Sequence, residues 1–202
     1  MKVALIRHGM TQSNLERRYL GRTDEPLCDE GAAQIVRYRA EGIYPQTDLL
    51  FCSPMLRCRQ TAQLISSAIP VLDEGLRETD FGDFEGKTYE QLKAAPDYIA
   101  WLETNGEGVV PNGESRAQMA ARCLAAFCRR MEEAVQQGSK APMFVVHGGS
   151  IMAILERFGA PPRPFYDYHV PNGQGFVLQI DHWDAQKRYP VCPIGTKEEE
   201  ER

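Results

Sequence analysis

The sequence lacks long hydrophobic runs, and its apolar stretches are only a few residues long. A helix that crosses a bilayer needs about 20 consecutive apolar residues, so we expect neither a membrane-spanning segment nor a membrane partner. The first residues also lack the basic region and the apolar region of a secretory signal peptide. We therefore expect a soluble globular protein located in the cytoplasm.

Positive charge is also scarce. The 23 lysine and arginine residues are outnumbered by 28 aspartate and glutamate residues, which gives a formal net charge of −5. Such a chain has no long-range attraction for nucleic acid, and its clustered arginines are typical of solvated helix faces. These arginines are Arg37, Arg39, Arg129 and Arg130. We expect no nucleic-acid partner.

The six cysteines include no C-x-x-C pair and are not accompanied by paired histidines. This spacing argues against a zinc site, so we expect no metal. Without a secretory signal we expect reduced thiols, with Cys52 in a buried strand and with Cys123 and Cys128 on one helix.

A length of 202 residues, 43% of them hydrophobic and 25% charged, fits one globular domain. We predict this domain over 1–196, followed by a disordered acidic tail at 197–202. The pattern predicts strands over 3–6, 48–52, 143–146 and 175–180, and helices over 27–39, 55–67, 114–137 and 150–158. Ser53 is expected to cap the second helix. The segment 88–113 is expected to form a small helical cover.

Two histidines follow buried strands in the same way. Arg7-His8-Gly9 ends the strand at 3–6, and His147-Gly148-Gly149 ends the strand at 143–146. Ligands of open α/β sheets bind at the carboxyl ends of the strands, so the two histidines would share one pocket if both strands are central and parallel. Arg57 lies at another junction of a strand with a helix, and Glu78 lies in an acid-rich loop expected near the same rim.

These residue types are suited to an oxyanion, above all a phosphoryl group. The guanidinium groups of Arg7 and Arg57 would bind its oxygens, and a neutral histidine can be the nucleophile, a role we assign to His8. Phosphoryl transfer of this kind depends on positioning and charge stabilisation and requires no metal. Glu78 could supply a proton to the leaving group and later accept one from water. On residue types alone, a passive anion site is equally compatible with the pattern.

A resemblance favours the enzyme. Arg7-His8-Gly9-Met10-Thr11 resembles the RHG-x-T signature of the histidine phosphatase superfamily, also called the phosphoglycerate mutase-like family. Further segments that match the family follow in the family's order, at 21–27, 53–62, 76–78, 81–86 and 147–148. The resemblance implies an α/β fold, namely a three-layer α/β/α sandwich around a mostly parallel central sheet.

The resemblance also implies roles for single residues. His8 would be the phosphorylated nucleophile and Glu78 the proton donor. The phosphate pocket would consist of Arg7, Arg57 and His147, with Asn14, the Gly148 amide, Thr11 and Thr23 as further phosphate contacts. Thr11 is equally suited to shaping its loop, and Ser53 to capping a helix.

Two positions depart from the family pattern. Cys28 stands where a capping serine or threonine is common, which predicts a helix cap weaker by about 1 kcal/mol. Phe84 stands where a tryptophan is frequent. Neither change removes a catalytic group.

The segment 76–86 looks more like that of α-ribazole phosphatases and broad-specificity phosphatases than that of cofactor-dependent phosphoglycerate mutases. We therefore predict a metal-independent phosphomonoester hydrolase that needs no cofactor. Its substrate would be a small phosphorylated metabolite, such as α-ribazole 5'-phosphate or a sugar phosphate. A phosphoglycerate mutase and a non-catalytic phosphate-binding regulator are the alternatives, and both a monomer and a homodimer remain open.

The role of several aromatic and histidine residues also stays open at this stage. Tyr89, Tyr98 and Trp101 in the cover could stack on a substrate ring, although burial in the core is favoured. His169 and His182 are expected to be structural or surface residues. Tyr168, Asn172 and Gly173 are candidates for the pocket wall by position alone.

Overall fold

The structure is a computed structural model that describes residues 1–195, so the predicted acidic tail at 197–202 lies outside the described residues. Within them, seven strands form one sheet in the order β3-β2-β4-β1-β6-β7-β5. The strands are β1 (Lys2–Arg7), β2 (Leu49–Cys52), β3 (Val71–Leu72), β4 (Pro142–Val146), β5 (Gly159–Ala160), β6 (Gly175–Gln179) and β7 (Tyr189–Ile194). Every strand except β6 runs in the direction of β1, which confirms the mostly parallel sheet.

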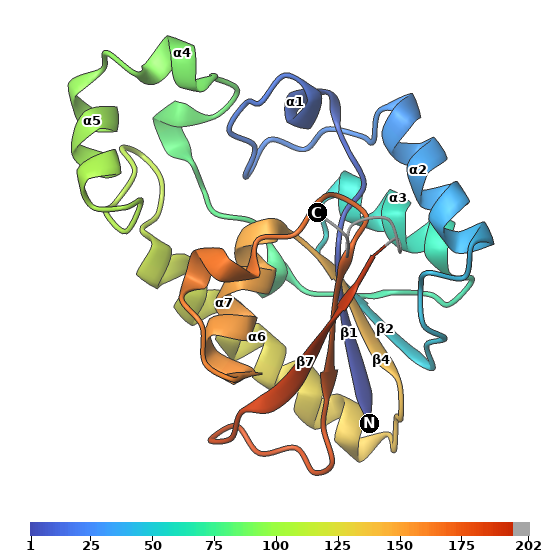
Figure 1. The fold of residues 1–202 in the computed structure, drawn as a ribbon. Coiled ribbons are helices and arrows are strands. Elements are labelled where there is room, and N and C mark those ends of the chain that lie inside the picture. Colours follow the sequence, from blue (N-terminus) through green and yellow to red (C-terminus); the bar gives the residue numbers. More distant parts are fainter. Residues whose placement is uncertain (196–202) are drawn as a thin grey trace.

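Helices cover both faces of the sheet, as Figure 1 shows. The longer ones are α2 (Asp29–Ala40), α3 (Leu56–Ile65), α5 (Pro96–Glu103), α6 (Arg116–Gln136) and α7 (Gly148–Phe158), and the short ones are α1 (Gln12–Leu15) and α4 (Tyr89–Leu92). The 3-10 helices are η1 (Glu74–Leu76), η2 (Gly82–Phe84) and η3 (Phe165–Tyr168). With α2 and α3 on one face and α6 and α7 on the other, the predicted α/β/α sandwich is confirmed.

The alternation of side chains along β1 explains the two layers. Val3 and Leu5 pack with the buried side chains of α6 and α7, whereas Ala4 and Ile6 pack with those of α2 and α3. Successive side chains of a strand point to opposite faces, so a strand that is apolar throughout requires cover on both sides. The core therefore consists of two apolar layers separated by the sheet.

The cover segment lies apart from these layers (Figure 1), and its α4 and α5 surround a small apolar cluster. The buried members of this cluster are Phe84, Leu92, Tyr98 and Val110. Tyr98 therefore belongs to a core, as favoured, while Tyr89 is largely exposed. Among residues 1–195, no helix has both the length and the hydrophobicity needed to cross a membrane.

Two features differ from the sequence predictions. The prediction that Ser53 caps α3 is wrong, because Met55 is the N-cap residue and the Ser53 hydroxyl lies beside His147 instead. Strand β7 was not predicted, because Pro190 and Pro193 break the usual strand pattern. Strand β5 accompanies β7 only at Tyr189 and Pro190, and prolines are tolerated on such edge strands.

Candidate active site

Two histidines meet at the carboxyl ends of adjacent parallel strands. Arg7 in β1 lies opposite Val146 in β4, so the next residues, His8 and His147, leave the sheet at the same edge. The His8 amide donates to the Val146 carbonyl oxygen at 3.0 Å, and the two imidazole ring centroids are 5.2 Å apart. Both rings are buried. The structure thus brings the two predicted histidines together.

The hydrogen bonding of His8 determines which of its nitrogens can react. Nδ1 lies 2.7 Å from the Gly9 carbonyl oxygen, which can only accept a hydrogen, so Nδ1 carries the proton and donates. Burial lowers the pKa of His8 well below its usual value, and the positive charges of Arg57 and Arg7 lower it further. The ring is therefore neutral, with its lone pair on Nε2.

The His147 ring contacts two side chains, those of Ser53 and Cys58. Its Nε2 lies 2.8 Å from the Ser53 hydroxyl and 3.5 Å from the Cys58 sulfur. Burial, followed by the charge of Arg57, keeps the pKa of His147 well below its usual value, so this ring is neutral as well. It occupies the N-cap position of α7, whose first amides belong to Gly148 and Gly149.

The two predicted arginines differ in their exposure to the site. Arg7 lines the cavity, and its Nη1 donates to the Val170 carbonyl oxygen at 2.7 Å. Arg57 is fully buried and is not among the described residues that line the cavity, and its Nη1 and Nη2 donate to the carbonyl oxygens of Thr23 and Gly21 at 2.9 and 2.8 Å. Among the described residues, the buried Nε of each guanidinium has no hydrogen-bond partner. A buried donor without a partner is costly, so each of these guanidinium groups keeps an unused donor.

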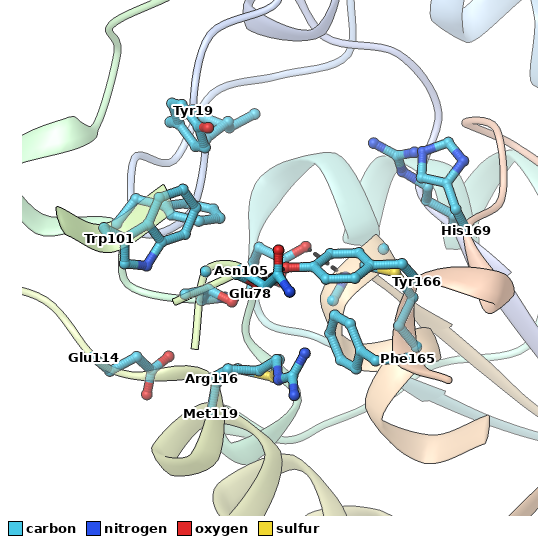
Figure 2. Close-up of a pocket in the computed structure, with 18 of the residues that line it drawn as sticks. Tyr19, Glu78, Trp101, Asn105, Glu114, Arg116, Met119, Phe165, Tyr166 and His169 are labelled. Atoms are coloured by element: carbon cyan, nitrogen blue, oxygen red, sulfur yellow. Dashed lines mark hydrogen bonds between the residues drawn. The ribbon is translucent and has the colours of Figure 1, made fainter. Parts of the chain in front are cut away.

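Glu78 faces the same cavity, as Figure 2 shows. Its Oε2 accepts the Gly149 amide at 3.0 Å, and its Oε1 accepts the Thr79 amide at 2.9 Å. A Cβ atom on Gly149 would lie 2.3 Å from Glu78 Oε1, so the absence of a side chain there is what lets the carboxylate approach α7. The proton donor implied by the resemblance is therefore fixed next to the helix that begins after His147.

The remaining predicted phosphate contacts fall into two groups. Asn14 lines the cavity, and because its Oδ1 accepts from Asn172 and from the Thr11 amide, its Nδ2 is left to donate to a ligand. Gly148 also lines the cavity. Thr11 is buried and caps α1 through Asn14, and the Thr23 hydroxyl donates to Glu85 at 2.8 Å, so the lining formed by the described residues includes neither threonine.

The cavity itself has a volume of about 520 Å³ and extends well beyond the histidines. Its far end is largely aromatic, and Figure 2 shows Tyr19 and Trp101 on one side and Phe165 and Tyr166 on the other. The Tyr166 hydroxyl donates to the Asn105 carbonyl oxygen at 2.7 Å and thereby joins η3 to the cover.

Other candidates for the pocket wall have mixed outcomes. Trp101 lines the cavity and also packs against the cluster of the cover. Tyr168 belongs to the main core, and Asn172 acts behind Asn14 by binding it and the His8 carbonyl oxygen. His169 lines the cavity, which the sequence did not predict, and His182 is exposed.

Two residues that hold the loops of the site in place were not predicted from the sequence. The Glu85 carboxylate accepts the amides of Gly21, Arg22 and Thr23, and thus fixes the loop whose carbonyl oxygens hold Arg57. Arg122 of α6 performs a similar task for the loop that carries Glu78. Glu85 stands in a segment that the resemblance had marked, whereas Arg122 gives no signal because it resembles any exposed arginine of an amphipathic helix.

The six cysteines all fall within residues 1–195, and each is a free thiol there. Cys52 is buried in β2, and Cys123 and Cys128 both lie on α6. Within the same residues, no group of three or more His, Cys, Asp or Glu side chains is arranged to hold a metal ion.

Comparisons with known proteins agree with this geometry. A phosphoglycerate mutase from Thermus thermophilus superposes with a TM-score of 0.72 at 31% identity, over 97% of this chain and 99% of that one. The α-ribazole phosphatase from Shigella flexneri superposes with a TM-score of 0.81 at 26% identity, over 97% of this chain and 96% of that one.

In sequence, the 2,3-bisphosphoglycerate-dependent phosphoglycerate mutase 2 of Gloeobacter violaceus is 32% identical over 206 residues, which cover 95% of this chain and 92% of the relative. The model of the histidine phosphatase superfamily (branch 1) matches residues 3–189. The chain therefore belongs to the histidine phosphatase superfamily.

Proposed function

We propose that this chain is a metal-independent phosphomonoester hydrolase that works through a phosphohistidine on His8. The observation that carries the proposal is the Nδ1 bond to the Gly9 carbonyl oxygen, which leaves Nε2 of a neutral imidazole free to attack phosphorus. The guanidinium groups of Arg7 and Arg57 supply the positive charge for the phosphoryl oxygens, a role that phosphoryl transfer elsewhere gives to metal ions.

The reaction takes two steps. His8 Nε2 bonds to phosphorus while the bond from phosphorus to the ester oxygen breaks, and Glu78 gives its proton to the departing alkoxide. Glu78, now ionised, takes a proton from a water molecule whose oxygen attacks the phosphohistidine, and His8 leaves as a neutral ring. Phosphate and the free alcohol are the products, and both residues return to their starting states.

The walls of the far end of the cavity support hydrolysis of a ring-bearing ester over a reaction on phosphoglycerate. A phosphoglycerate is small and carries a carboxylate as well as its phosphate, so it needs further cationic groups. The arginines at the far end are already engaged: Arg18 binds Glu16 and the Gly86 carbonyl oxygen, and Arg116 binds Glu107. The aromatic walls are better suited to a planar ring on the leaving alcohol. The superposition with an α-ribazole phosphatase supports the same class.

A phosphoglycerate mutase is the second candidate, because a relative of that name covers almost the whole chain. A mutase must return the phosphoryl group to an acceptor before water reaches it. The two candidates therefore differ in the fate of the same phosphohistidine.

The decisive experiment is steady-state hydrolysis of a phosphomonoester panel in the presence of a chelator. The panel contains α-ribazole 5'-phosphate, sugar phosphates and 3-phosphoglycerate, and isomerisation of the last is followed with and without 2,3-bisphosphoglycerate. We expect phosphate release that the chelator leaves unchanged. His8→Ala should abolish release, and Glu78→Gln should slow it by about 10²- to 10⁴-fold.

A covalent label identifies the intermediate directly. Enzyme quenched in alkali during turnover of a ³²P-labelled ester should retain label in the wild type and lose it in His8→Ala. Isomerisation of 3-phosphoglycerate that far exceeds every hydrolysis rate would replace the hydrolase by the mutase. A folded wild type without any turnover would favour a non-catalytic phosphate-binding protein.

A further inference from the structure

An arginine from a distant helix binds the main chain of the loop that carries Glu78, in addition to Ser150 of α7, whose hydroxyl donates to the Leu76 and Arg77 carbonyl oxygens. After η1 the loop continues without regular structure through Arg77, Glu78 and Thr79. The guanidinium of Arg122, in α6, reaches its main chain. Nη1 donates to the carbonyl oxygens of Gly75 and Arg77 at 3.0 and 2.8 Å, and Nη2 donates to that of Glu78 at 3.1 Å.

A carboxylate completes the arrangement on the other side of Glu78. Glu114 forms an ion pair with Arg122, and its Oε1 also accepts the Asp80 amide at 2.9 Å. The pair thus holds three carbonyl oxygens at or before Glu78 and one amide after it. The planar fork of an arginine can serve several carbonyl oxygens at once, which the single ammonium of a lysine cannot do in the same geometry.

The loop needs such support because it is open on two sides. Glu78 and Glu114 line the main cavity, and both also line a second crevice of about 260 Å³, together with Arg122. Apolar packing anchors the start of the segment at Leu76, which is fully buried in the main core, but Glu78 itself faces both openings. The charged pair adds hydrogen bonds to the main chain around Glu78, and charge-assisted bonds are the stronger kind.

We propose that Arg122 and Glu114 are positioning residues that hold Glu78 in place for proton transfer to the leaving group. This inference rests on the proposed function, in which Glu78 is the proton donor. Neither residue contacts the reacting atoms in this scheme. Their effect passes through the main chain at residues 75–80, which sets the distance between the Glu78 carboxyl group and the ester oxygen.

The leaving group separates this role from a general structural one. The nitrophenolate released from p-nitrophenyl phosphate departs without a proton, whereas an alkoxide needs one. The test therefore compares kcat/KM on p-nitrophenyl phosphate with kcat/KM on ribose 5-phosphate, for wild type, Glu78→Gln, Arg122→Gln and Glu114→Gln. For Arg122→Gln we expect about a 10- to 100-fold loss on the sugar ester, a part of what a general acid contributes, and a loss below about threefold on the aryl ester. Glu114→Gln should show the same selectivity.

The matched control is Arg129→Gln. Arg129 lies on the same helix and binds Asp73 at the base of the same loop, before the residues that Arg122 holds. This variant should leave both rates close to those of the wild type. The double variant Arg122→Gln with Glu78→Gln should be no slower on the sugar ester than Glu78→Gln, because the pair acts only through Glu78.

The outcomes distinguish the two proposals. Selective loss in Glu78→Gln combined with equal losses on both esters in Arg122→Gln and Glu114→Gln, or with no loss in them, would overturn the positioning role alone. Losses in Glu78→Gln that do not depend on the leaving group would overturn Glu78 as the proton donor and the positioning role with it. If Arg122→Gln does not fold, Glu114→Gln carries the test by itself.

Discussion

The Nδ1 hydrogen of His8 is committed to the Gly9 carbonyl oxygen, and this bond leaves Nε2 as the ring nitrogen that the proposed mechanism uses to attack phosphorus. His147 is likewise buried and neutral. Both rings are removed from water and lie near positively charged arginines, and both effects disfavour the charged form of the imidazole. In the proposed mechanism this neutral state makes His8 available as the nucleophile. The folded state also does not readily accept a proton at either ring.

Acid should destabilise the protein for this reason. In the unfolded chain both histidines titrate near the usual value of 6.5, while in the folded state their pKa values lie well below it. Below pH 6.5 the unfolded state therefore binds more protons, and the free energy of unfolding falls as the pH falls. Between pH 6.5 and 5.5 we expect a loss of about 1 kcal/mol for each histidine. Urea unfolding across this range measures it.

The control for this titration is His8→Asn. This variant should reduce the slope of stability against pH, because one buried imidazole is gone. A wild type whose stability is constant from pH 7.5 to 5.5 would contradict the neutral assignment of the two rings.

Gly149→Ala tests how closely Glu78 must approach α7. The added Cβ atom would lie 2.3 Å from Glu78 Oε1, so the carboxyl group must move. Alanine is the better helix former, so the free energy of unfolding should not fall, while kcat on an alkyl phosphate should drop by about 10- to 100-fold. Gly148→Ala is the comparison, because its Cβ atom meets Arg7 at an ordinary 3.6 Å and the loss should be smaller. An unchanged kcat in Gly149→Ala would show that Glu78 tolerates the displacement.

The start of α2 offers a prediction about a helix cap. Cys28 is the N-cap residue, and its sulfur accepts the Gly31 amide at 3.3 Å. Sulfur is a weak acceptor, and serine is among the preferred caps, so Cys28→Ser should raise the free energy of unfolding by about 0.5 to 1 kcal/mol. Cys28→Ala, which removes the acceptor, should lower it. Urea unfolding of the three proteins decides, and a serine variant less stable than the wild type would refute the argument.

Strands and helices were predictable where local patterns determine them. The apolar runs at 3–6 and 143–146 became the central β1 and β4, because a strand buried on both faces must be apolar throughout. Ser53 shows the limit of local rules: its position before a helix favours capping, yet its hydroxyl binds a histidine that follows it by 94 residues in sequence. Arg129 and Arg130 look like solvated residues, but both bind the buried Asp73.

The resemblance allowed us to predict which residues converge at the site. It did not allow us to predict the residues that hold the site's loops in place. Arg7, His8, Glu78 and Gly148 meet in one cavity because the strand ends meet, as the family motifs implied. Arg57 and His147 are fully buried and are absent from the cavity lining formed by the described residues, a degree of burial that no spacing in the sequence encodes. Glu85 and Arg122 contribute through bonds to main-chain carbonyl and amide groups, which any chain presents. Sequence patterns therefore cannot reveal them.

The central position of β1 in the sheet has a consequence for folding during synthesis on the ribosome. Residues 2–7 pair with residues 143–146 on one side and with residues 175–179 on the other. The strand that precedes His8, the proposed nucleophile, is thus synthesised before both of its partner strands, and such long-range pairing slows folding. A nascent chain or a truncated fragment holds His8 without its pocket. Turnover should therefore begin only after β4 and β6 have been synthesised and have paired with β1. The time at which activity appears during synthesis would then report when folding is complete.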